Sequence, residues 1–173
     1  LLAGGKRLRP LLVLLAYELV GGVDPEEILP LALAFEMIHT ATLVHDDIND
    51  NAKTRRGLPT LHERFSQEKA LITGDWLFVQ GFSLGGRLDS EVVNIIAKCC
   101  GLIASAEFKQ INHVMDLTTS PDDYLTIVEG KTAGPFAGGC EGAAVIAGAS
   151  KEEREALVRF GTEMGISFQL VDD

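Results

Sequence analysis

Three helix-start signatures occur in this chain of 173 residues, and they constrain its fold more than any other feature. Each has a capping residue followed three positions later by an acid, and two of them place proline at the first helical position. The signatures lie at 24–27, 120–123 and 150–153. Apolar residues between them recur at helical spacing, as at Leu29, Leu33 and Ile38, and no stretch alternates like a strand. The sequence therefore predicts an all-α fold built as a helix bundle.

A long apolar segment and several glycine turns complete the predicted bundle. Residues 92–106 are too continuously apolar and too long for a strand, so we expect a buried helix there. Turns are predicted at 21–22, 57–59 and 85–86. No linker divides the chain, and we expect a single domain over 1–173. Because the chain starts at Leu1 and stops in mid-pattern at Asp173, we expect this domain to lack its native N- and C-terminal helices.

The charge balance limits the class of partner. The formal net charge of −10 argues against a nucleic-acid surface. A few basic residues are clustered, which favours a local site for a small anionic substrate; they are Lys6, Arg7, Arg9, Arg55 and Arg56. The three cysteines, Cys99, Cys100 and Cys140, lack metal-type spacing, so we expect reduced thiols in a cytoplasmic protein. No signal peptide is visible, and we expect no membrane span.

The run His45-Asp46-Asp47-Ile48-Asn49-Asp50 concentrates the chemistry of the chain. On a helix, Asp46 and Asp50 lie one turn apart with Asp47 on the flank, and His39 falls on the same stripe. A solvated acidic helix end is the ordinary interpretation of such a run alone. Inside an apolar bundle, however, unpaired carboxylates are costly. Mg²⁺ satisfies them with one or two carboxylates plus substrate phosphate and water, so the run predicts a metal and a phosphorylated ligand.

A second acidic cluster stands at the end of the chain. Gln169, Asp172 and Asp173 fall on one helix face, and we expect this face to oppose the first acidic helix across a cleft. Lys131-Thr132 offers a cation and a hydroxyl group, and the loop at 4–10 offers cations beside two glycines that let a phosphate approach the backbone. Each element alone is more often structural. Their joint occurrence favours a diphosphate site.

Six segments together resemble the trans-isoprenyl diphosphate synthases, also called polyprenyl synthetases. They follow the family's order along the whole chain, at 4–10, 39–50, 55–60, 74–78, 130–132 and 168–173. The resemblance implies antiparallel helices around a deep central cavity, an isoprenoid synthase fold. It also implies a prenyltransferase that condenses an allylic diphosphate with isopentenyl diphosphate by Mg²⁺-assisted ionisation, condensation and elimination. Family members commonly form homodimers, and we expect the same here.

The resemblance also implies a role for each matching residue. About three Mg²⁺ ions would be bound by the acids of the two clusters, which are Asp46, Asp47, Asp50, Asp172 and Asp173. The allylic diphosphate would contact Arg55 and Lys131. Isopentenyl diphosphate would be held by Lys6, Arg9, His39 and Arg56. The residues beside the allylic carbon, which would steady the cation, are Lys131, Thr132 and Gln169. Gly74 and Asp75 are expected to be structural.

The expected product length depends on the residue five positions before the first acid. In the family, a bulky aromatic residue there stops chain growth early, whereas this chain has Ala41, followed by Thr42. The small side chain predicts a long product, of more than about twenty carbons. Deeper residues on neighbouring helices could still close the cavity.

Three other classes match parts of the sequence. His45-Asp46 is also the core dipeptide of metal-dependent phosphohydrolases, but His62 and His113 do not have the spacing of the further ligands. A class I terpene cyclase shares the first acidic motif and lacks the Gly-Lys-Arg loop. A non-catalytic subunit of a heteromeric polyprenyl diphosphate synthase is the remaining alternative. Such subunits usually lose motif acids, and the acids are present here.

Overall fold

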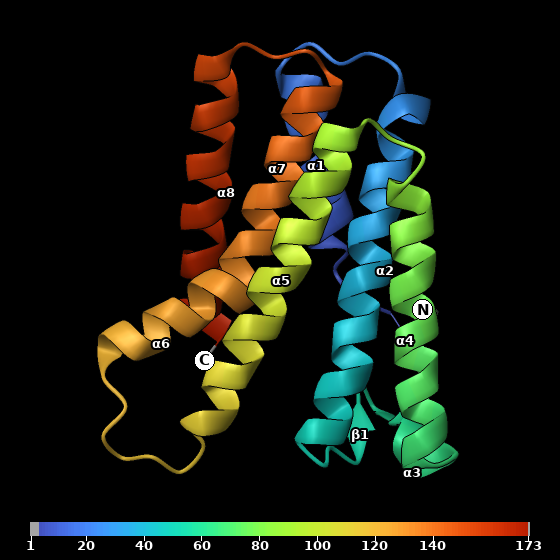
Figure 1. The fold of residues 1–173 in the computed structure, drawn as a ribbon, viewed down its shortest axis with the longest axis vertical. Coiled ribbons are helices and arrows are strands. Elements are labelled where there is room, and N and C mark those ends of the chain that lie inside the picture. Colours follow the sequence, from blue (N-terminus) through green and yellow to red (C-terminus); the bar gives the residue numbers. More distant parts are fainter. Residues whose placement is uncertain (1–3, 173) are drawn as a thin grey trace.

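Helices that run up and down the molecule build the fold (Figure 1). The computed structural model describes residues 4–172. In chain order, the helices are α1 (Leu8–Leu19), α2 (Pro25–Asn49), α3 (Leu61–Arg64), α4 (Gln67–Gly85), α5 (Ser90–Asn112), α6 (Pro121–Val128), the π-helical turn η1 (Glu129–Ala133), α7 (Gly134–Ile146) and α8 (Lys151–Asp172). Within the described part of the chain, the strands are the two-residue β1 (Thr54–Arg55) and β2 (Leu58–Pro59). The predicted all-α fold is confirmed.

The predicted helix starts at 24, 120 and 150 are also confirmed. The Asp24 carboxylate accepts a hydrogen bond of 3.0 Å from the backbone N–H two residues further on. Ser120 and Asp123 form a reciprocal capping box, as do Ser150 and Glu153. These contacts satisfy N–H groups that have no partner inside the helix. Helix starts were predictable because they depend on residues close together in sequence.

The main core lies between α1, α2, α5 and α7. Its fully buried side chains include Val13, Ile28, Leu31, Ile96 and Phe136. Each such side chain contributes roughly 1.5–3 kcal/mol through removal of apolar surface from water. Glycines let α7 approach its neighbours closely, since a Cβ at Gly138 would lie 2.1 Å from Sγ of Cys99. The core therefore holds α1 and α2, two helices that contribute residues to the site.

Burial on two of the predicted helices follows the neighbours that pack against them rather than apolar spacing alone. Leu29 and Leu33 are 47% and 42% exposed, because α2 turns a neighbouring stripe, which includes Ile28 and Phe35, towards the core. The helix predicted at 92–106 is present as part of α5, but it buries only one face. Leu102, for example, is 41% exposed on this helix. Apolar spacing predicted these helices, whereas the buried face depends on which neighbours pack against them.

Helix α2 is the one helix in the described residues that is long and apolar enough to cross a membrane by length and composition. In this fold it packs against α1, α4 and α7. A core helix of a globular bundle has the same composition when it is covered on several sides. The expectation that the protein has no membrane span stays a prediction.

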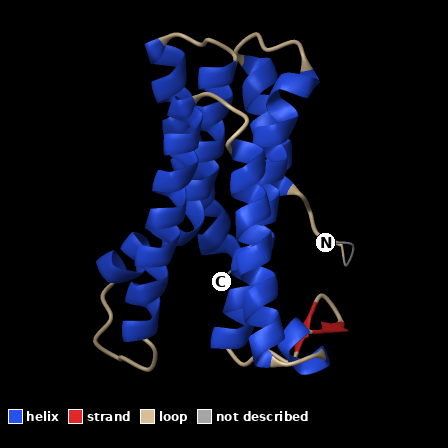
Figure 2. Cartoon of the chain, turned by 45° about the vertical axis from the view of Figure 1, so that its right-hand side comes forward, coloured by secondary structure: helices blue, strands red, loops and turns tan. Residues whose placement is uncertain are grey.

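A short hairpin follows α2 and carries two of the predicted site residues. Strands β1 and β2 pair antiparallel, with Thr54 opposite Pro59, at the end of the bundle where α2 stops (Figure 2). Arg56 and Gly57 form the turn with φ of 53° and 76°, as a two-residue hairpin turn requires. The buried Thr60 hydroxyl group donates a hydrogen bond of 2.7 Å to the Ala52 carbonyl. This bond anchors the hairpin beside the end of α2.

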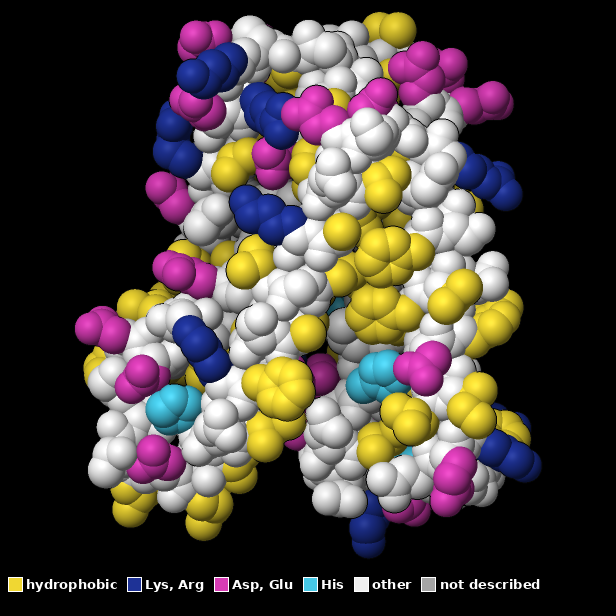
Figure 3. All heavy atoms as spheres, in the orientation of Figure 1, with side chains coloured by type: hydrophobic (Ala, Val, Ile, Leu, Met, Phe, Trp, Pro, Cys, Tyr) yellow, Lys and Arg dark blue, Asp and Glu magenta, His cyan; other side chains and the backbone are white. Residues whose placement is uncertain are grey.

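Towards the end of the bundle that carries the hairpin, α5 and α6 diverge from α2 and α4 (Figure 1). The molecular surface is hollowed between these two pairs of helices (Figure 3). The acidic end of α2 lines a cavity together with the C-terminal part of α5. The fold therefore brings the first acidic motif to the open end of the bundle.

Candidate functional site

The four residues predicted to bind isopentenyl diphosphate line one cavity of about 480 Å³. Lys6 and Arg9 come from the start of the chain, His39 from α2 and Arg56 from the hairpin turn. Gly5 lets the N-terminal loop pass close to the hairpin, because a Cβ there would lie 2.7 Å from Nη1 of Arg56. Four side chains from three separate segments thus meet around one space that suits an anion.

Burial and neighbouring charges set the electrostatics of this cavity. Burial lowers the pKa of Arg9 to about 10, and Glu36 acts in the opposite direction, so the guanidinium stays charged at neutral pH. The same guanidinium lies 5.1 Å above the centre of the Phe136 ring, which restrains it by a cation–π contact. Burial, followed by the nearby arginines, lowers the pKa of His39 to about 3. His39 is therefore neutral and offers one N–H donor.

Glu36 is the acid on α2 within this basic cavity. Its carboxylate forms an ion pair with Arg7, the residue that precedes α1. Arg56, in the hairpin turn, donates a hydrogen bond to the Gly4 carbonyl oxygen. These two contacts connect the N-terminal loop to α2 and to the hairpin, and they restrain Arg7 and Arg56.

Asp46 lies in a second cluster, beside Lys131. The distance from Nζ of Lys131 to Oδ1 of Asp46 is 3.5 Å, and Lys131 also contacts Glu107 at 2.6 Å and Gln110 at 3.1 Å. Burial raises the pKa of Asp46, Lys131 lowers it, and Glu107 and Asp50 raise it further. Sequence reasoning missed Glu107 and Gln110. Their signal was an acid and an amide at i, i+3 on α5, just beyond the apolar segment that predicted this helix.

Asp47 and Arg55 contact each other. The buried Asp47 carboxylate accepts a hydrogen bond of 2.6 Å from Nε of Arg55. Asp50 is exposed and caps the C-terminal end of α2. The acids of the first motif therefore have different surroundings: Asp46 faces Lys131, Asp47 faces the hairpin, and Asp50 faces solvent.

Thr132 joins the π-helical turn to α8. Its buried hydroxyl group donates a hydrogen bond of 2.9 Å to Oε1 of Gln169. One turn further along α8, Asp172 lines the basic cavity, whereas Asp46 lines a different, apolar one. Asp173 lies outside the described residues. Adjacent residues, Lys131 and Thr132, thus connect the two acid-bearing helices.

Within residues 4–172, no three His, Cys, Asp or Glu side chains are close enough together to hold a metal ion by themselves. In the phosphohydrolase alternative, several protein ligands surround one metal site. His62 lies near the Thr60 hydroxyl group, and His113 contacts Thr119. Neither histidine supplies a further ligand beside Asp46.

An apolar cavity of about 370 Å³ begins at Asp46 and extends between α2, α4 and α5. Thr42, Phe78 and Ile103 are among its lining residues. Ala41, the residue on which the expected product length depended, is fully buried in a cluster with Ala70 and Leu77 between α2 and α4. The structure thus places Thr42, the next residue, on the apolar cavity.

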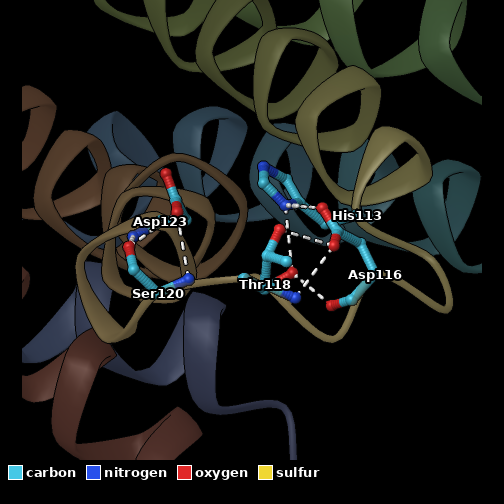
Figure 4. A network of polar contacts seen from close by, with 6 residues as sticks. His113, Asp116, Thr118, Ser120 and Asp123 are labelled. Atoms are coloured by element: carbon cyan, nitrogen blue, oxygen red, sulfur yellow. Dashed lines mark hydrogen bonds and ion pairs between the residues drawn. The ribbon is translucent and has the colours of Figure 1, made fainter.

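The loop between α5 and α6 borders a further cavity of about 450 Å³, which Lys131, Thr132 and Gln169 also line. Polar contacts hold this loop (Figure 4). His113 contacts the Thr119 hydroxyl group at 3.0 Å, and Asp116 accepts two hydrogen bonds from Thr118. The three residues predicted beside the allylic carbon therefore share one cavity with a well-anchored rim.

The model of the polyprenyl synthetase family matches residues 1–173. The chain belongs to this family. A geranylgeranyl diphosphate synthase from Methanosarcina mazei is 36% identical over 177 aligned residues, which cover 99% of this chain and 54% of the relative. The crystal structure of a decaprenyl diphosphate synthase from Rhodobacter capsulatus superposes with a TM-score of 0.94 at 41% identity, covering 99% of this chain and 53% of that one.

A third comparison includes a ligand. The crystal structure of a polyprenyl synthase from Caulobacter crescentus, complexed with calcium and isoprenyl diphosphate, superposes with a TM-score of 0.95 at 40% identity. It covers 99% of this chain and 52% of the other. The chain spans about half the length of the curated relatives it matches. The resemblance stated from six short segments is thus confirmed over the whole chain as membership of the polyprenyl synthetase family.

Proposed function

We propose that the protein carrying this chain is a trans-polyprenyl diphosphate synthase, a prenyltransferase that joins an allylic diphosphate to isopentenyl diphosphate. The observation that carries the proposal is the basic cavity, where Lys6, Arg9, His39 and Arg56 meet. Cations and a neutral histidine around one space suit a diphosphate that must be held without reacting. The relatives named as prenyl diphosphate synthases support the same chemistry.

We propose that acids at the ends of α2 and α8 bind Mg²⁺ together with the substrate phosphates. Carboxylates of Asp46, Asp50 and Asp172 are the hard oxygen ligands this ion prefers, and no closed protein cage exists within the described residues. Substrate phosphates would complete the shell, with Asp173 as a further expected ligand. Asp47 is already paired with Arg55, so we assign it to orienting that guanidinium. Bound Mg²⁺ would neutralise the charge that develops on the leaving diphosphate.

The protein's own groups account for the remaining steps. Arg55 and Lys131 hold the allylic diphosphate, and these prepositioned cations lower the barrier to breaking the carbon–oxygen bond. Oxygen atoms of Thr132 and Gln169 face the carbocation that this cleavage leaves. The double bond of isopentenyl diphosphate attacks it, and the departing diphosphate accepts the proton that is lost. Apolar walls keep water from the cation.

We further propose that the growing chain enters the apolar cavity beyond Asp46 and that the product exceeds about twenty carbons. Thr42, which lines this cavity, has a small side chain that leaves the entrance open. The named relatives make products of several lengths. We propose that the wall of this cavity sets the chain length here.

The test is incubation of the intact protein with Mg²⁺, labelled isopentenyl diphosphate and farnesyl diphosphate, followed by chromatography. We expect elongated diphosphates and no activity after chelation of the metal. Turnover that appears only when a second, different subunit is added would instead indicate the non-catalytic subunit. We also propose a homodimer in the cytoplasm, which sedimentation of the purified protein and cell fractionation would check.

A further inference from the structure

Three side chains surround the ammonium group of Lys131, and they are not equivalent. Glu107 is nearest at 2.6 Å, Gln110 follows at 3.1 Å, and Asp46 is the most distant at 3.5 Å. A charge-assisted hydrogen bond normally brings the two heavy atoms to about 2.7–2.9 Å. Lys131 therefore forms its closest ion pair with Glu107 and a longer one with Asp46.

Glu107 is itself held from a second side. Its Oε1 accepts a hydrogen bond of 3.2 Å from Nδ2 of Asn49, while its Oε2 faces Lys131. Each carboxylate oxygen of Glu107 thus contacts a different residue, and the Glu107 side chain is only 19% exposed. Since Asn49 ends α2, Glu107 on α5 ties together the acidic motif and the π-helical turn that carries Lys131. Three elements far apart in sequence meet at this one carboxylate.

A lysine side chain without such a partner would move to the nearest acid. The π-helical turn at 129–133 leads Lys131 towards α2 and α5, and Asp46 is the other carboxylate within reach. A tight Lys131–Asp46 ion pair would occupy the oxygen atoms that the proposed function assigns to a metal. Glu107 competes for the same ammonium group and lies closer to it.

We propose that Glu107 is a positioning residue, which holds Lys131 at the edge of the site and leaves the Asp46 carboxylate open. This inference rests on the proposed function, in which Lys131 holds the allylic diphosphate and Asp46 binds the metal. Glu107 acts through Lys131 and does not contact the reacting atoms. Asn49 supports it by fixing the second oxygen.

The first test measures binding without turnover, by calorimetry of the intact protein with magnesium pyrophosphate. Glu107→Gln is expected to weaken binding about tenfold, because Lys131 closes on Asp46. Glu107→Asp should recover part of the loss. Glu91→Gln, on the same helix but paired with Arg154, is the matched control and should bind as wild type does. Equal affinity of Glu107→Gln and the wild type would overturn the proposal.

A double-mutant cycle tests whether Glu107 acts through Lys131. With Glu107→Gln, Lys131→Met and the combination, we expect the double variant to bind no more weakly than Lys131→Met alone. Fully additive losses would contradict the proposal. In the prenyltransferase assay, Glu107→Gln should lower kcat about 100-fold with little change in the KM for isopentenyl diphosphate. If the wild type has no transferase activity, the proposed function fails, while the calorimetric cycle still decides the role of Glu107.

Discussion

The Thr132 hydroxyl group donates a hydrogen bond of 2.9 Å to Oε1 of Gln169, and this contact links the π-helical turn η1 to α8. Thr132→Val keeps the shape of the side chain but removes the donor. We expect a loss of about 1–2 kcal/mol in the free energy of unfolding, because the hydroxyl group is buried. Urea unfolding of the variant and the wild type measures this difference in the free energy of unfolding. Thr126→Val, at an exposed position on α6, is the control and should change stability by less than about 0.5 kcal/mol.

Asp46→Ala in the intact protein should lower turnover by several orders of magnitude, because it removes the carboxylate that faces Lys131 and is proposed to hold a metal. The fold should survive, since Glu107 and Gln110 still contact Lys131. Steady-state kinetics and circular dichroism check both statements. Asp122→Asn on the exposed start of α6 is the matched control. A near-normal rate for Asp46→Ala would remove this residue from the mechanism.

The pH dependence of stability should carry the signature of His39. Its pKa is about 3 in the folded protein, below the ordinary value of about 6.5 expected in the unfolded chain. Below about pH 6.5 the unfolded state binds a proton that the folded state does not, so stability falls as the pH falls. Between pH 7 and pH 5 the loss should be about 2 kcal/mol. His39→Gln should remove this part of the slope in urea unfolding, and an unchanged slope would contradict the assignment.

The accuracy of prediction from sequence depended on how local each feature is. The caps at Asp24, Ser120 and Ser150 were predicted because their partners lie within three residues. The exposure of Leu29 and Leu33 was not predicted, since apolar spacing defines a helix but does not show which neighbouring element covers it. The β1–β2 hairpin contains too few residues to show strand periodicity.

The candidate site shows the same difference between features that depend on residues close in sequence and features that depend on packing. The residues of the basic cavity were identified through a family resemblance, and the structure brings them together. The pairing of Asp47 with Arg55 could not be read from a helical wheel, because Arg55 belongs to a separate hairpin. Glu107 was missed because an acid at one end of an apolar helix resembles an ordinary solvated residue. Only the folded structure reveals its partners, Asn49 at the end of α2 and Lys131 on η1.

Gly74→Ala should destabilise the protein by about 1–3 kcal/mol through overpacking. A Cβ at Gly74 would lie 2.2 Å from Nε2 of His45, whose ring is stacked on Phe78 and whose Nε2 lies 3.3 Å from the Leu71 carbonyl oxygen. Gly101→Ala on α5 is the opposite case, because nothing lies within 4 Å of its Cβ position. It should stabilise the helix by about 0.5–1 kcal/mol. Thermal unfolding of both variants separates packing from helix propensity, and equal effects would refute the close contact.

The side chain that limits product length can be identified by comparing two neighbouring positions. Thr42 lines the apolar cavity, whereas Ala41 is 0% exposed and packed between α2 and α4. Thr42→Phe should fill the entrance and shorten the product with little loss of stability. Ala41→Phe should instead destabilise the protein by about 1–3 kcal/mol, because the bulky ring has no space among Ala70 and Leu77. Product chromatography and urea unfolding of both variants distinguish the two effects. A shorter product from Ala41→Phe, together with wild-type stability, would show that α2 presents a different face to the growing chain.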